Sequence, residues 1–81
     1  MSQCTALHGK AMNLSDRAAA AFKRGEEERA KILYKNASDV ELQALLICDP
    51  ANTRTVMILR NSLDALRAKA KDPRPVGMQE E

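Results

Sequence analysis

Residues 18–37 read AAAAFKRGEEERAKILYKNA, and this stretch holds the end of one helix and the start of the next. Lys23 and Arg24 precede Gly25, and cations in a last turn followed by glycine are a common helix stop. Glutamates fill residues 26–28, where carboxylates complement the dipole of a first helical turn. Small residues on both sides of the glycine therefore predict two closely packed antiparallel helices.

The first predicted helix lies upstream of Gly25. Small and apolar residues recur there in steps of 3 and 4, which places them on one helical face: Cys4, Leu7, Ala11, Leu14, Ala18, Ala21 and Phe22. Gly9 lies off this face and favours fraying of the first turns. A helix start near residue 3 and one near residue 10 therefore both stay open.

A second apolar stripe predicts a helix that runs to about residue 48. Asn36, Ser38 and Asp39 have poorer helix propensity, so a break near residue 38 stays open. The stripe consists of Ala30, Leu33, Tyr34, Ala37, Val40, Leu45 and Cys48, with Ala44 beside it.

Asp49-Pro50 is predicted to end the second helix and begin the third. Proline disfavours a helical conformation in the residue before it, and Asp49 and Pro50 suit the N-cap and first helical position. The third helix carries Val56, Leu59, Leu63, Leu66 and Ala70 on one side and ends at Asp72-Pro73. The sequence thus predicts an all-α, antiparallel three-helix bundle over residues 3–72. Residues 73–81 hold two prolines, a glycine and two terminal acids, and we expect a disordered tail there.

The composition fits a small soluble domain rather than a nucleic-acid or membrane protein. Its 81 residues carry a net charge of +2, from 13 basic and 11 acidic residues that interleave. Aromatic residues make up 2%, so base-stacking positions are lacking and no nucleic-acid partner is expected. No segment approaches the roughly 20 apolar residues that span a bilayer, and no secretory signal is evident. We expect a cytoplasmic protein without membrane insertion.

The hairpin around Gly25 resembles a tetratricopeptide-repeat (TPR) hairpin. Family positions for small residues, the glycine and a large residue match Ala18, Gly25, Ala30, Tyr34 and Ala37 in order and spacing. Asp49-Pro50-Ala51-Asn52 looks like the turn that begins a further repeat, with Leu59 and Leu63 at its packing positions.

The resemblance covers about residues 11–66 and departs from the TPR pattern in two ways. Leu14 and Arg17 replace the expected aromatic and leucine, and Pro50 comes 13 residues after Ala37, which makes the second helix too long for one regular repeat.

The long helices are similar to those of the MIT domain (microtubule interacting and trafficking), a three-helix bundle. Its Ala-x-x-Leu-Tyr motif appears as Ala30-Lys31-Ile32-Leu33-Tyr34, and Leu66-Arg67-Ala68 looks like the end of its third helix. Both resemblances imply binding of peptide or helical segments of other proteins. They point to the groove between the first and third helices, which would be lined by Ser15, Ala19, Phe22, Lys23, Arg54, Met57, Asn61 and Asp64. The alternative is that Phe22 is core and the rest are solvated surface.

No catalytic, metal or cofactor site is expected. His8 is the single histidine and has no ligand at metal spacing, and the acids of the second helix, Glu41 among them, are expected on a solvated face. Cys4 and Cys48 lie 21 and 23 residues from Gly25, so an antiparallel hairpin places both at one end. They are either small buried hydrophobic residues or a thiol pair that can form a disulfide.

The sequence therefore predicts a non-catalytic protein-protein interaction module or small adaptor. A self-assembling helical subunit is one alternative, because several apolar residues lie partly off the stripes: Leu42, Leu46, Ile47, Met57 and Ile58. A dedicated chaperone of one helical client is the other.

Overall fold

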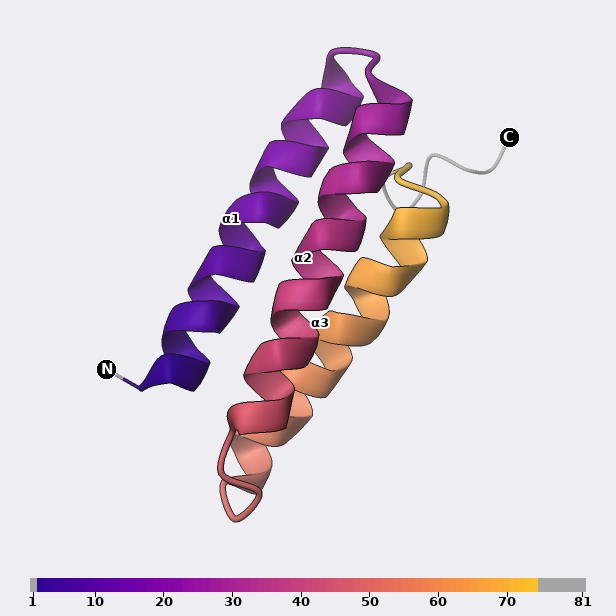
Figure 1. Cartoon of the computed structure of the whole chain (residues 1–81). Helices are drawn as coiled ribbons and strands as arrows, with labels where there is room; N and C mark the ends of the chain where they lie inside the picture. The colour runs from indigo at the N-terminus through magenta and orange to yellow at the C-terminus, as the bar shows by residue number, and fades with distance from the viewer. Residues whose placement is uncertain (1, 75–81) are drawn as a thin grey trace.

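The computed structural model describes residues 2–74, which form three α-helices and no strand (Figure 1). The helices are α1 (Gln3–Lys23), α2 (Glu27–Ile47) and α3 (Thr53–Lys71). They run antiparallel in sequence order, so the predicted all-α three-helix bundle is confirmed. Residues 75–81 of the predicted tail lie outside the described residues.

The turn between α1 and α2 is built on Gly25. Its φ of +83° lies in the left-handed region that side chains with a Cβ rarely adopt. The Gly25 amide donates to the carbonyl of Phe22 and the Glu26 amide to that of Ala21, both at 2.9 Å. These two bonds are the Schellman pattern, which satisfies carbonyls at a helix end. The predicted helix stop is therefore confirmed.

The first helix starts at Gln3, so Gly9 does not delay it. The Ser2 hydroxyl caps α1 by accepting a hydrogen bond from the Thr5 amide at 3.2 Å. The second helix is continuous through residue 38, and its weaker helix formers cause no break.

The third helix starts later than predicted because Asn52, and not Asp49, is its N-cap. Asn52 accepts a hydrogen bond from the Thr55 amide at 3.3 Å. The Asp49 carboxylate instead accepts from the Ala51 amide at 2.9 Å, and the Asn52 amide donates to the Asp49 carbonyl at 3.0 Å. Asp49-Pro50 thus forms a separate turn, because a short carboxylate bonds readily to the backbone two residues on.

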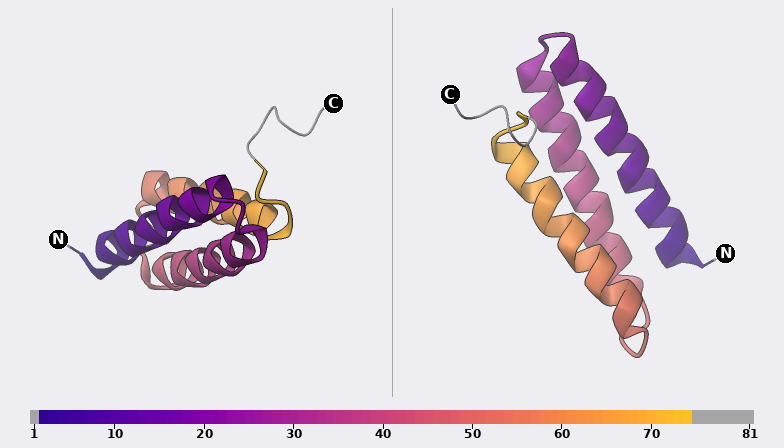
Figure 2. Two further views of the ribbon diagram at one scale, coloured as in Figure 1. Left: turned by 90° about the horizontal axis from the view of Figure 1, so that it is seen from above. Right: turned by 180° about the vertical axis from the view of Figure 1, so that it is seen from behind.

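The second helix is the central one. It packs along both α1 and α3, whereas α1 and α3 barely touch each other (Figure 2). One core cluster, nearest the α2–α3 turn, joins Cys4, Ala44, Cys48 and Leu59. A second cluster further along the bundle joins Ala18, Tyr34, Ala37 and Leu66. Each cluster takes side chains from all three helices, so together they fix both outer helices on α2.

Burial follows the predicted stripes on all three helices, with two additions. Ser38 and Glu41 are buried on α2, although the sequence predicted a solvated position for Glu41. Pro73, assigned from the sequence to the tail, is also fully buried. Beside it, Arg74 Nη2 lies 2.6 Å from Asp72 Oδ2, and hydrogen bonds from Arg74 lower the pKa of Asp72 to about 2. Ordered structure thus continues just beyond α3.

Candidate functional site

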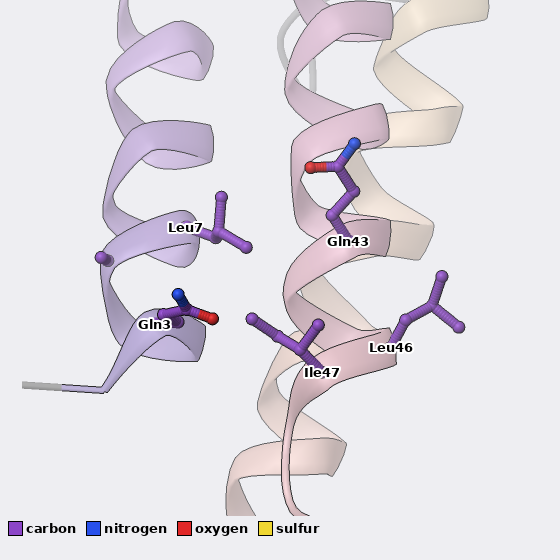
Figure 3. Close-up of a pocket in the computed structure, with 6 residues that line it drawn as sticks. Gln3, Leu7, Gln43, Leu46 and Ile47 are labelled. Atoms are coloured by element: carbon purple, nitrogen blue, oxygen red, sulfur yellow. The ribbon is translucent and has the colours of Figure 1, made fainter.

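An apolar groove lies between the start of α1 and the end of α2 (Figure 3). Its volume is about 450 Å³, which falls in the range of ligand-binding clefts. Gln3, Ala6 and Leu7 line it from α1, and Gln43, Leu46 and Ile47 line it from α2. The close-up shows Leu7 and Ile47 directed toward the space between the two helices. The groove therefore offers aliphatic walls and two amides, with no charge in its lining.

Large apolar side chains are exposed at the same end of the bundle. The exposed fractions are 74% for Leu46, 49% for Ile47, 63% for Met57 and 51% for Ile58. The α2 residues end that helix and the α3 residues belong to its first turns, so all four flank the turn at residues 48–52. Exposure of leftover apolar residues was expected from the sequence, and Leu46, Ile47 and Ile58 confirm it, whereas Leu42 is half-buried.

Two free thiols lie next to this groove. Cys4 and Cys48 are 7% and 9% exposed, belong to one core cluster, and line a second cavity of about 310 Å³. Burial, followed by hydrogen bonding to Cys48 and the charges of Cys48 and Glu41, raises the pKa of the Cys4 thiol. The two cysteines thus come together as the hairpin predicts, and Cys4 stays protonated more readily than an exposed thiol would.

Glu41 and His8 form a buried polar contact that the sequence analysis missed. His8 Nδ1 lies 2.8 Å from Oε2 and 3.0 Å from Oε1 of Glu41. The Glu41 side chain is 0% exposed and that of His8 is 31% exposed. The prediction of a solvated Glu41 was wrong, because Glu41 lies between Ala37 and Ala44 on the buried stripe of α2. That spacing was the signal available in the sequence.

A third cavity, of about 480 Å³, lies between α2 and α3, and most of the residues that line it are charged. Lys35, Asp39, Arg67 and Lys71 contribute to its lining. Lys35 Nζ lies 3.3 Å from the Asp39 carboxylate, so part of this charge is already neutralised within the chain. Exposed ion pairs of this kind are common on solvated helix faces.

The eight predicted partner-binding residues differ in their exposure. On α1, Ser15, Ala19 and Phe22 are half-buried and Lys23 is exposed. On α3, all four are exposed: Arg54, Met57, Asn61 and Asp64. Met57 and Asn61 each lie two residues from the buried Leu59, and a step of two turns a helix by roughly 200°. Met57 and Asn61 therefore point away from the bundle core.

Other features of residues 2–74 bear on partner classes. No three His, Cys, Asp or Glu side chains in this part of the chain are grouped to share a metal ion. Along residues 2–74, the helices lack an apolar stretch of the length needed to cross a membrane.

Lys69 lies against the ring of Tyr34, with Nζ 5.8 Å from the ring centre. Burial, followed by the charge of Asp16, raises the pKa of Tyr34.

Comparison of the chain with models of known protein families, with curated proteins and with solved structures finds no significant match in any of the three.

Proposed function

We propose that this chain is a non-catalytic protein-interaction module that holds an amphipathic helix of another protein in the apolar groove between α1 and α2. The proposal rests on the exposure of Leu46, whose side chain is 74% exposed at the edge of a groove lined by Leu7 and Ile47. Leaving such a side chain in water forgoes its burial free energy, roughly 1.5–3 kcal/mol for a leucine. A partner that covers Leu46 recovers this free energy.

An amphipathic helix suits the groove because of its chemistry. The lining is aliphatic, which favours apolar anchors spaced three or four residues apart on the partner. Gln3 and Gln43 can exchange hydrogen bonds with polar residues at the edge of such a helix. The lining carries no charge, so neither sign of partner charge is excluded.

The groove between α1 and α3, which the sequence resemblances favour, is less well supported. Ser15, Ala19 and Phe22 present a half-buried face of α1, but Met57 and Asn61 lie on the far side of α3 from its core residues. A partner seated between α1 and α3 therefore reaches few of the predicted α3 contacts. A TPR-like or MIT-like origin of the bundle remains our proposal, and its three packed helices are compatible with it.

Self-assembly is the second candidate function. It is favoured by the exposure of Leu46, Ile47, Met57 and Ile58 at one end of the bundle, since an exposed apolar surface can pair with that of a second copy. In that case the same end of the bundle is covered by a second copy and not by a different protein.

Selection from a library of displayed helical peptides tests the proposal. We expect binders with apolar residues at helical spacing whose affinity falls at least tenfold with Leu46→Lys. Ile32→Lys is the matched control, because Ile32 is also an exposed α2 residue, at 60%, and does not line the groove. Binders that lose affinity equally with both variants, or with neither, would contradict the proposed site. Sedimentation of the unliganded chain at increasing concentration distinguishes peptide binding by a monomer, whose mass stays constant, from self-assembly, in which the mass rises.

A further inference from the structure

The two buried cysteines lie directly behind the walls of the apolar groove. Gln3 precedes Cys4 at the start of α1, and Ile47 precedes Cys48 at the end of α2. Gln3 and Ile47 line both the apolar groove and the neighbouring cavity that contains the two thiols. Figure 3 shows Gln3 and Ile47 on facing helices. Any change in the backbone separation at Cys4 and Cys48 therefore changes the distance between Gln3 and Ile47, the facing walls of the groove.

We propose that Cys4 and Cys48 form an intramolecular disulfide under oxidising conditions, and that this bond narrows the apolar groove. Both cysteines are free, both are buried in the cluster with Ala44 and Leu59, and both line a cavity of about 310 Å³ beside the groove. The effect on binding rests on the proposed function, whereas formation of the bond does not.

The oxidant is a small-molecule disulfide such as oxidised glutathione. One cysteine thiolate attacks a sulfur of that disulfide, which forms a mixed disulfide and releases one glutathione thiol. The second cysteine thiolate then attacks the mixed disulfide and releases the other. The protein loses two protons and two electrons, and the glutathione disulfide gains both pairs, because each departing glutathione thiolate takes up one proton.

Bond formation draws the helix ends together. A disulfide brings the sulfurs to about 2.05 Å and holds the two alpha carbons within about 7 Å. Van der Waals contact between thiols is longer than this bond, so any part of the shortening that side-chain rotation does not supply moves the start of α1 toward the end of α2. The raised pKa of Cys4 lowers its thiolate fraction, and we therefore expect oxidation over hours at neutral pH and faster reaction at higher pH.

The first test is oxidation of the full chain with oxidised glutathione, followed by mass measurement and peptide mapping. We expect a loss of two hydrogen atoms and a Cys4–Cys48 linked peptide pair. Closing a loop of this length should raise the melting temperature by about 10 °C or more. Cys4→Ala and Cys48→Ala should each abolish both effects. Links between chains, or a stable mixed disulfide with glutathione, would overturn the proposal.

The second test probes the apolar groove with the uncharged apolar dye Nile red. The reduced chain should bind the dye at least threefold more tightly than the oxidised chain, and Leu46→Lys should weaken binding to the reduced form. A linked peptide pair with unchanged dye affinity would overturn the narrowing of the groove and leave the proposed function intact. Dye affinity that changes neither on oxidation nor with Leu46→Lys would contradict the apolar groove as a binding site and hence the proposed function. Formation of the disulfide is tested independently by the mass and the melting temperature.

Discussion

Glu41 is a carboxylate without solvent contact, and His8 supplies its hydrogen bond from another helix. The pair joins α1 to α2 among alanines that bury little area each, so it specifies how the two helices are rotated relative to each other. Misrotated packings would leave the carboxylate without a partner.

Removal of the imidazole should destabilise the chain more than removal of both partners. We expect His8→Ala to lower the free energy of unfolding by about 1–3 kcal/mol, because a buried acceptor is left unsatisfied. The double variant His8→Ala/Glu41→Met should recover most of this loss, since an apolar side chain of similar size needs no partner. Urea denaturation measures both values. Equal losses of unfolding free energy in the single and double variants would contradict this prediction, because they would show that an unpaired Glu41 is not what destabilises His8→Ala.

The proximity of Cys4 and Cys48 could be predicted from the sequence, whereas the burial of Glu41 could not. The two outcomes have different physical reasons. Counting residues from Gly25 suffices to bring Cys4 and Cys48 to one end, because helical rise is constant. Glu41 follows the periodicity of the stripe, but an acid is rarely buried without a partner. That partner, His8, lies 33 residues away, and only the packing of α1 on α2 brings the two together.

At the scale of the helix, the turns were predictable from local chemistry and the caps were only partly so. Gly25 stops α1 because its backbone adopts a left-handed conformation that the flanking residues disfavour. Asp49 and Asn52 are both capable N-caps, and the choice between them depends on the Asx turn that Asp49 forms with the Ala51 amide. Residue preferences alone do not settle that competition.

The two described glycines should respond oppositely to alanine. Gly25→Ala should cost about 1–2 kcal/mol, because φ is +83° there and a Cβ is strained in that region. Gly9→Ala should gain about 0.5–1 kcal/mol, because Gly9 lies inside α1 and a Cβ there meets nothing within 4 Å. Thermal and urea unfolding measure both. A neutral Gly25→Ala variant would contradict the helix stop as we describe it.

At the scale of the whole molecule, α2 carries both outer helices and leaves one end apolar. The chain extends 42 × 21 × 15 Å, and its exposed Leu46, Ile47, Met57 and Ile58 all flank the α2–α3 turn. The sequence indicated these residues as leftover from the core stripes. It did not indicate the groove beside them, because Leu7 was assigned to the core and its place at the groove depends on how α1 docks on α2.

The most direct measurement of the central claim is amide chemical-shift mapping by NMR while a selected helical peptide is titrated into the isotope-labelled chain. We expect the largest changes at Leu7, Gln43 and Ile47, which form the facing walls of the apolar groove. Largest changes on Phe22, Asn61 and Asp64 would instead place the partner against α1 and α3 and would contradict the account.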